Sequence, residues 1–185
     1  DAFGDLGTLL ILIVILVYIV MATQFESLKF PFIIMFTIPF AFTGVFLALW
    51  MTSTPLSLIA LIGAIMLVGI VTKNGIVMVD YMNLLIERGS GVFDAVIAGG
   101  KSRLRPVLMT SFTTILGMLP LAIGTGAGSE TWQPMGIAVI GGLTFSTILT
   151  LFIVPVLYSI LVNRSQRKER EKLARLAAEH QASVH

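Results

Sequence analysis

Lys73 is the residue of this sequence whose position most needs a chemical explanation. It lies near the middle of an apolar stretch over residues 56–79, which is long enough to cross a bilayer. A lysine at the centre of a membrane helix costs about 2.5–3.5 kcal/mol on insertion scales, so such residues are usually paired and functional. Either Lys73 has a partner of opposite charge, or it loses its own charge.

The neighbours of Lys73 on the same helix do not supply that partner. Three residues at helical spacing share the face of Lys73, with no carboxylate one turn away: Val77, Asp80 and Leu84. Asp80 lies about 10.5 Å further along the helix, so a direct ion pair is impossible, although water could link the two groups. Asn74 lies about 100° round the helix and can donate or accept a hydrogen bond. The alternatives are that Asp80 is a carboxylate near the membrane interface and that Lys73 snorkels to the surface.

The next apolar segment begins with arginines and hydroxyls. Arg103 and Arg105 stand at its start and are interpreted equally well as anchors at the lipid headgroups. Hydroxyls in membrane helices usually bond to the carbonyl four residues back or contact a neighbouring helix. That is the expectation for Ser111, Thr113 and Thr114.

The sequence shows no constellation typical of an enzyme or a metal site. No nucleophile lies beside a base, no spacing fits a metal, and there is no cysteine. The nine methionines are scattered without a close repeated pair, so packing is a better interpretation than a copper or silver relay. The glycine-rich run at 124–130 is not in a strand–loop–helix context and is expected to be a tight turn. We therefore expect no bond-making enzyme, no metal site and no nucleic-acid partner.

Composition identifies the chain as an integral membrane protein. Hydrophobic residues make up 56% and charged residues 12% of the chain, whereas soluble domains carry roughly 25% charged residues. Five segments approach the roughly 20 apolar residues of a spanning helix: about 6–22, 31–51, 56–85, 106–125 and 134–162. Interior prolines are expected to kink three of them, at Pro39, Pro120 and Pro155. The predicted fold is all-α, a five-helix transmembrane bundle in the lipid bilayer.

The basic residues predict the orientation of this bundle. They lie in the first loop, the third loop and the tail: Lys29, Arg88, Lys101, Arg103, Arg105 and six cations from Arg164 to Arg175. With five spans, these segments fall on one side of the membrane, which the positive-inside rule makes cytoplasmic. The N-terminus is then predicted to face the opposite side.

Two segments outside the spans are predicted to be helical. Residues 92–103 place small or apolar side chains at helical spacing ahead of the cations: Val92, Ala95, Val96 and Gly99. This pattern is typical of an amphipathic helix at the cytoplasmic surface. The tail alternates charge signs and is predicted to be a solvated helix in which Glu171 pairs with Arg175. The chain is thus divided into a five-span transmembrane domain, 1–162, and a cytoplasmic tail, 163–185.

Several ordered segments carry a family resemblance. They are QFESL at 24–28 followed by Pro31, TPLS at 54–57, GIVTKNGIVMVDY at 69–81, RLRPVLMTS at 103–111, and GMLPLA through GTGAGS at 117–129. Together they resemble the resistance–nodulation–division permeases, and within them the hydrophobe/amphiphile efflux type of Gram-negative bacteria. The resemblance implies a full protein of twelve spans in two repeated halves, of which this chain resembles spans eight to twelve. The first residue, Asp1 rather than Met, also suggests a processed chain or a piece of a longer one.

The resemblance also implies roles for individual residues. In that family, carboxylates on the fourth span bind protons and pair with a lysine on the tenth span, which Lys73 matches. Asn74 matches the asparagine beside that lysine, and Thr110 matches a threonine on the next helix. Arg103 matches a basic residue at the cytoplasmic entrance, and Asp80 is a weaker relay candidate. The family's aspartates have no counterpart here, so the implied partner of Lys73 lies in the remaining half of the permease.

The function implied is the transmembrane proton-coupling portion of a proton/drug antiporter, with the proton as coupling ion and no cofactor. The resemblance further implies a homotrimer in the bacterial inner membrane, with a periplasmic N-terminus, a cytoplasmic C-terminus, a periplasmic adaptor and an outer-membrane channel. The alternatives are a metal-ion exporter of the same superfamily, a non-transporting scaffold or translocation auxiliary, and a truncated remnant. A scaffold would gain stability by losing Lys73. Without the carboxylates, this chain alone is not expected to pump.

Overall fold

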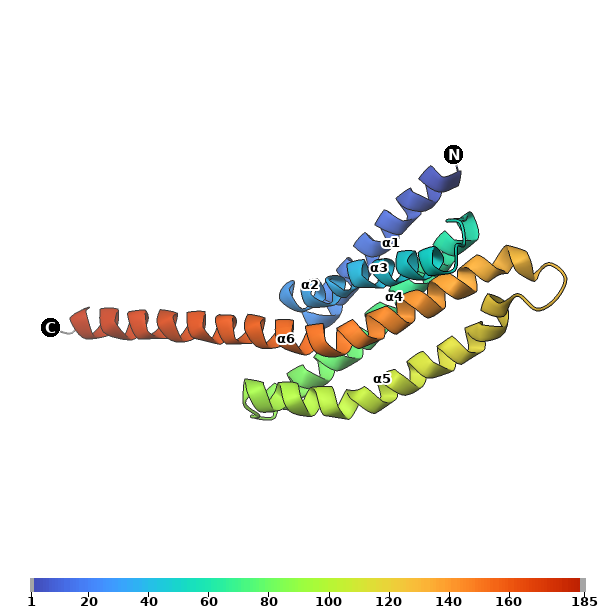
Figure 1. The fold of residues 1–185 in the computed structure, drawn as a ribbon. Helices are drawn as coiled ribbons and strands as arrows, with labels where there is room; N and C mark the ends of the chain where they lie inside the picture. The colour runs from blue at the N-terminus through green and yellow to red at the C-terminus, as the bar shows by residue number, and fades with distance from the viewer. Residues whose placement is uncertain (1, 184–185) are drawn as a thin grey trace.

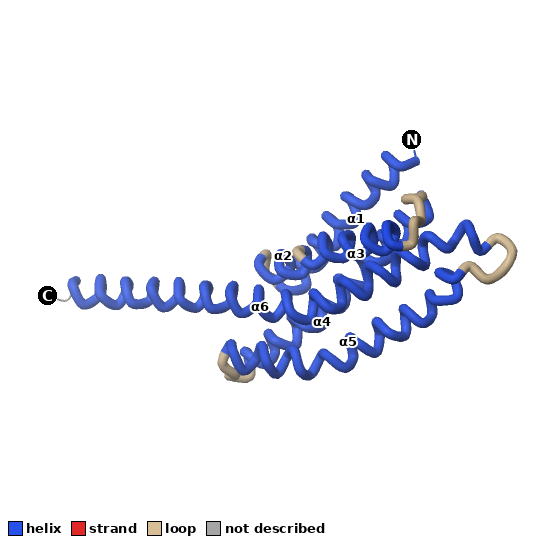
Figure 2. Tube along the Cα trace, in the orientation of Figure 1, coloured by secondary structure: helices blue, strands red, loops and turns tan. Residues whose placement is uncertain are grey.

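The chain folds entirely into α-helices joined by short turns. The computed structural model describes residues 2–183, with side chains for residues 2–176, so the last two residues of the predicted tail lie outside the described part. The helices are α1 (Ala2–Phe25), α2 (Lys29–Met35), α3 (Thr37–Met51), α4 (Leu58–Glu87), α5 (Val92–Ile123) and α6 (Ser129–Ser183). No strand occurs in the described residues (Figure 2). The predicted all-α bundle is confirmed.

Five rods in this fold are long and apolar enough to cross a membrane, as predicted from the apolar runs. Four are single helices, and the fifth is α2 and α3 together, Lys29–Met51. The break between them falls at Phe36, directly after Met35. A proline ring meets the carbonyl four residues back, and for Pro39 that carbonyl belongs to Met35. The kink expected at Pro39 is therefore a break, whereas α5 and α6 continue through Pro120 and Pro155.

The ends of two spans show why the chain turns where it does. Before α4, the Ser57 side-chain oxygen accepts a hydrogen bond from the Ala60 N–H at 3.2 Å, which satisfies a donor that the helix itself leaves free. After α5, Gly124 adopts a φ of 71°, a left-handed conformation that glycine takes without steric cost. The glycine-rich run after α5 is thus the tight turn predicted from the sequence.

The turns sort to the two ends of the bundle (Figure 1). The N-terminus, the α3–α4 turn and the α5–α6 turn lie at one end. The α1–α2 turn and the α4–α5 turn lie at the other, where α6 also runs on far beyond the bundle. The basic loops and the basic tail therefore share one end of the molecule, as the positive-inside argument requires.

Helix α6 is the centre of the packing, with α3, α4 and α5 against it. One buried cluster is built from α3, α4 and α6 and includes Val45, Leu67 and Leu143. A second joins α1, α2, α4 and α6 and includes Met21, Met78 and Tyr158. Helix α1 contributes a single buried residue to this core, so it lies on the periphery of the bundle.

The two segments predicted outside the spans are continuations of spanning helices. Residues 92–103 form the first part of α5, and their small and apolar stripe packs inward: Val92, Ala95 and Gly99 are buried. A Cβ added at Gly99 would lie 2.6 Å from the Met82 side chain of α4. The tail is the last part of α6, where Arg167 rather than Arg175 pairs with Glu171, at 3.0 Å.

Candidate functional site

Lys73 lies on the face of α4 that the rest of the chain leaves open. Exposed residues recur along this helix at intervals of three, four or seven positions: Ile62, Met66, Gly69, Lys73, Asp80 and Leu84. This spacing follows the helical period, so the exposed positions form one stripe along the span. The face predicted to carry Lys73 and Asp80 together is confirmed, and it is the uncovered side of α4.

A hollow of about 300 Å³ between α1 and α4 contains Lys73. Its walls are apolar apart from Lys73 and Thr72: Leu16, Val17, Val20, Met21, Gly69, Ile76 and Val77. The Thr72 hydroxyl is buried and has no hydrogen-bond partner in the described part of the chain. Among residues 2–176, the Lys73 ammonium likewise makes no hydrogen bond or ion pair. A cation therefore projects into an apolar recess of a spanning helix, and no described residue neutralises it.

Asn74 follows this lysine in the chain but does not line its hollow. Its side chain is 9% exposed, and it lies on the packed side of α4 beside the open stripe. Gly75 follows it, and a Cβ there would lie 2.9 Å from the Ile34 side chain. Helix α4 is therefore held close to α2 at the level of the lysine. Asp80, two turns further along, is exposed and makes no ion pair with any described residue.

Arg103 is held by a contact that the sequence did not suggest. Its guanidinium carbon lies 4.7 Å from the centre of the Tyr81 ring, so α5 is joined to α4 by a cation–π interaction. Its Nε is buried and has no hydrogen-bond partner within the described residues. Tyr81 directly follows Asp80, so Arg103 lies at the same end of the open stripe as that carboxylate.

The hydroxyls of α5 divide into two groups. The Thr110 side chain is exposed and donates to its own helix, to the Pro106 and Val107 carbonyl oxygens at 3.1 and 3.0 Å. Ser111, in contrast, is buried and shares a hydrogen bond of 2.9 Å with Thr147 of α6. The Thr110 hydroxyl is therefore exposed on α5 and bonds to its own helix, whereas the Ser111 hydroxyl links α5 to α6.

Comparison with known proteins gives the family of the chain. The model of the AcrB/AcrD/AcrF family matches residues 1–162, which is the whole predicted transmembrane domain. The chain belongs to this family. The resistance–nodulation–division membership predicted from the motifs is thereby confirmed, and the chain is part of a multi-pass membrane protein of a transporter family rather than an enzyme.

Relatives in the AcrB/AcrD/AcrF family differ in the kind of resistance that their names state. The multidrug resistance protein MdtC of Erwinia tasmaniensis is 43% identical over 155 residues, which is 83% of this chain and 15% of that protein. The cobalt-zinc-cadmium resistance protein CzcA of Cupriavidus metallidurans is 41% identical over 155 residues, covering 84% of this chain and 15% of that protein. The chain spans about 15% of the length of these relatives.

A solved structure of a family relative confirms the helical arrangement. A heavy metal efflux pump superimposes with a TM-score of 0.77 at 31% identity, covering 85% of this chain and 16% of that one. The five apolar rods are therefore arranged as in a transmembrane portion of such a pump.

The sequence singled out Lys73, Asn74, Thr110 and Arg103 as site residues. It did not predict the contact of Arg103 with Tyr81, because a contact between two helices produces no spacing pattern within either helix.

Proposed function

We propose that this chain is the proton-coupling transmembrane portion of a proton/drug antiporter that exports hydrophobic or amphiphilic compounds. The observation that supports it most is the position of Lys73, which lies in an apolar hollow on the open face of α4. The chain has about 15% of the length of its relatives, so a segment outside it can cover this face. Carboxylates on such a segment would be the partners of Lys73.

Electrostatic attraction to carboxylates is what stabilises Lys73 in the span in this proposal. Two opposite charges about 4 Å apart attract by about 4 kcal/mol at an effective dielectric constant near 20. This attraction exceeds the roughly 2.5–3.5 kcal/mol that insertion of a lysine at the helix centre costs. Pairing with a carboxylate would therefore offset the cost of placing Lys73 in the span. When protons neutralise the carboxylates, the attraction is lost and Lys73 turns towards another polar group.

Asn74 and Thr110 are the polar groups proposed to receive Lys73 in its unpaired state. Asn74 is adjacent in the chain and has no side-chain hydrogen bond to another described residue, so its amide is available. Thr110 presents an exposed hydroxyl on the neighbouring helix α5. Arg103 and Asp80 are assigned weaker roles, at the cytoplasmic entrance of the relay.

Tight packing would carry this local change to the rest of the bundle. Two glycines of α4 touch other helices: Gly75 approaches Ile34 of α2, and Gly63 approaches Met135 of α6. Helices packed this closely cannot deform continuously, so a change of partner at Lys73 biases discrete helix shifts. In the complete protein, those shifts would drive the substrate-binding domains outside the membrane.

The exported compounds are the least constrained element of the proposal. We favour hydrophobic or amphiphilic drugs because the Lys73–Asn74 motif resembles that of drug exporters. The alternative is a metal-ion exporter, which the 41% identity to a cobalt-zinc-cadmium resistance protein supports. Susceptibility of a pump-deficient host that carries the complete protein distinguishes them. Lower susceptibility to lipophilic antibiotics and dyes supports drug export, and lower susceptibility to zinc, cobalt and cadmium salts supports metal export.

The proposal includes the assembly and location that the family resemblance implies. It comprises a homotrimer in the bacterial inner membrane, joined to a periplasmic adaptor and an outer-membrane channel. The N-terminus of this chain would be periplasmic and its C-terminus cytoplasmic. Clustering of the basic loops and the basic tail at one end of the bundle supports this orientation (Figure 1).

Replacement of Lys73 in the complete protein tests the coupling role. Lys73→Ala is expected to lower proton-coupled export in proteoliposomes by more than about tenfold. A tenfold change corresponds to about 1.4 kcal/mol, which is less than the attraction of about 4 kcal/mol between Lys73 and the proposed carboxylates. Lys101→Ala is the matched control, because Lys101 is an exposed lysine at the start of α5 outside the hollow. Its export is expected to stay within about twofold of the wild type. Export that survives Lys73→Ala unchanged contradicts the proposal.

A further inference from the structure

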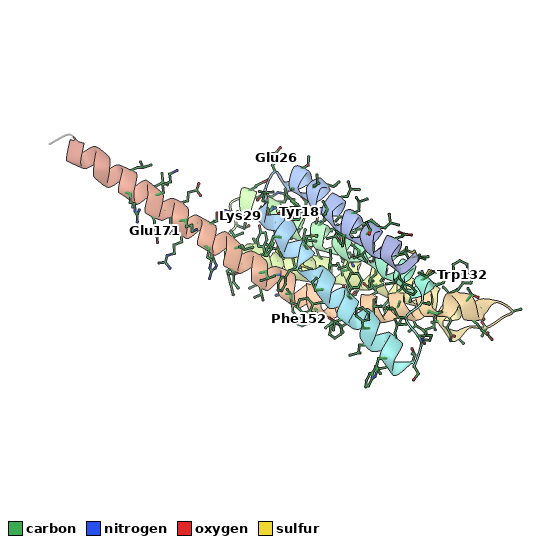
Figure 3. The ribbon with its side chains drawn as sticks, turned by 90° about the horizontal axis from the view of Figure 1, so that it is seen from above. Tyr18, Glu26, Lys29, Trp132, Phe152 and Glu171 are labelled. Carbon is green, nitrogen blue, oxygen red and sulfur yellow. The ribbon has the colours of Figure 1, made fainter. Side chains whose placement is uncertain are left out.

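A basic hollow lies where α6 leaves the bundle. It has a volume of about 540 Å³ and is formed between the start of α2 and the extension of α6. Four cations line it: Lys29, Arg164, Arg167 and Lys168. Glu171 is the single carboxylate in its wall, so the lining carries an excess of positive charge. Figure 3 shows Lys29 and Glu171 at this end of the molecule and Trp132 at the opposite end.

The donors of this hollow are arranged to bind an oxyanion. The Lys29 ammonium donates to the Ser165 hydroxyl oxygen at 2.9 Å, so the hydroxyl proton stays free to donate to a ligand. Glu171 occupies only the Nε of Arg167, at 3.0 Å, which orients the guanidinium and leaves its two terminal amino groups available. Two segments that are 136 residues apart thus supply donors to one exposed site.

A second hollow adjoins the first on its apolar side. It has a volume of about 250 Å³ and shares Lys29, Leu161 and Ser165 with the basic hollow. Phe30 and Val162 complete its apolar part, and both are half-buried against the core, whereas Ser27 and Gln166 line the remainder. Phosphate donors and a recess with one apolar wall, formed by Phe30, Leu161 and Val162, therefore lie side by side at the point where α6 emerges from the membrane-spanning part.

We propose that these two hollows bind an anionic phospholipid. The phosphate of the headgroup lies among Arg164, Arg167 and Lys168, and an acyl chain follows the recess beside Leu161. Basic pockets between spanning helices on the cytoplasmic side are suited to such headgroups, because anionic lipids are enriched there. A zwitterionic lipid lacks the net charge that this lining complements. The proposal requires only that the chain spans a membrane, and it is independent of any role for Lys73.

Lipid binding to the complete protein tests the site with two matched variants. The first is Arg164→Gln/Arg167→Gln/Lys168→Gln, which removes three cations of the hollow. The second removes three cations of the same tail that do not line it, namely Arg170→Gln/Lys172→Gln/Arg175→Gln. Native mass spectrometry measures binding of phosphatidylglycerol, with phosphatidylcholine as the zwitterionic comparison. The first variant is expected to bind phosphatidylglycerol more than about tenfold more weakly, and the second less than about threefold, since each nearby cation contributes roughly 1 kcal/mol.

Other results assign the site differently. Equal losses in both triple variants would show a diffuse basic tail rather than a built site and would overturn the proposal. Equal retention of the two lipids would overturn it as well. Displacement of phosphatidylglycerol by millimolar inorganic phosphate would assign the hollow to a free anion instead of a lipid. Lys29→Gln leaves the cations of the tail in place and is expected to weaken phosphatidylglycerol binding about fivefold, which checks the site from the α2 side.

Discussion

The close approach of α3 and α6 makes a sharp prediction about Gly141. A Cβ added at this position would lie 2.1 Å from the Ala48 Cβ and 2.9 Å from the Gly44 carbonyl oxygen. Carbon atoms in contact are normally about 3.5–4.0 Å apart, so the two Cβ atoms would have to separate by about 1.4 Å more. The Gly44 carbonyl oxygen belongs to the backbone, so no side-chain rotation can relieve this clash. Gly141→Ala therefore requires α3 and α6 to move apart.

The expected cost follows from two opposing terms. Overpacking of this kind costs about 1–3 kcal/mol, and a contact with backbone belongs near the top of that range. Alanine regains up to about 1 kcal/mol through its higher helix propensity. We therefore expect Gly141→Ala to lower the free energy of unfolding of the complete protein by about 2 kcal/mol. This figure is large enough to measure by titration with a denaturing detergent.

Two further variants show whether the contact itself is responsible. Gly117→Ala on α5 is the matched control, because a Cβ at Gly117 has no neighbour within 4 Å, and it is expected to be neutral or stabilising. Ala48→Gly removes the closest obstacle, so combining it with Gly141→Ala should restore at least about 0.5 kcal/mol relative to the sum of the single effects. If Gly141→Ala behaves like Gly117→Ala, the helices are not as close as described and the reasoning is wrong.

Two contacts between helices give further predictions, checked by the same titration. Ser111→Ala leaves the Thr147 hydroxyl without its partner and is expected to cost about 0.6 kcal/mol, up to roughly 1.7. An unchanged free energy of unfolding would mean that the hydroxyls find other partners. Arg103→Lys keeps the charge but loses the planar stacking on Tyr81, for an expected loss of about 0.5–1 kcal/mol. Arg105→Lys, on an exposed arginine without a stacking partner, should show no loss, and equal effects of the two would contradict the cation–π assignment.

The spans were predictable because a membrane imposes a local rule on sequence. Every backbone group inside the bilayer must be satisfied within its own helix, so a span requires a long uninterrupted apolar run. All five predicted runs correspond to apolar rods of the structure. Their ends were less predictable: α5 and α6 continue into polar sequence at 92–103 and 163–183, where helix propensity and packing replace hydrophobicity as the cause.

The break near Pro39 shows a second limit on what the sequence can predict. The sequence indicated that a proline would disturb the span, but an interior proline can bend, break or leave a helix continuous. Neighbouring groups decide which occurs, because they satisfy the freed carbonyls. At the break, the Thr37 hydroxyl donates to the Ile34 carbonyl oxygen at 2.6 Å, one residue before the Met35 carbonyl that Pro39 leaves free, whereas α6 passes Pro155 without interruption. The same residue type thus has two outcomes in one chain.

The sequence by itself determined that Lys73 is an anomaly, because the cost of an unpaired charge in a membrane rises with its depth in an apolar run. It determined equally that Asp80 cannot pair with it, since helix geometry fixes their separation. Only the tertiary structure decided which side of α4 is open and that Lys73 faces an apolar hollow beside α1. It alone brought Lys29 to Ser165, because contacts between distant segments depend on how helices pack and leave no periodic trace in the sequence.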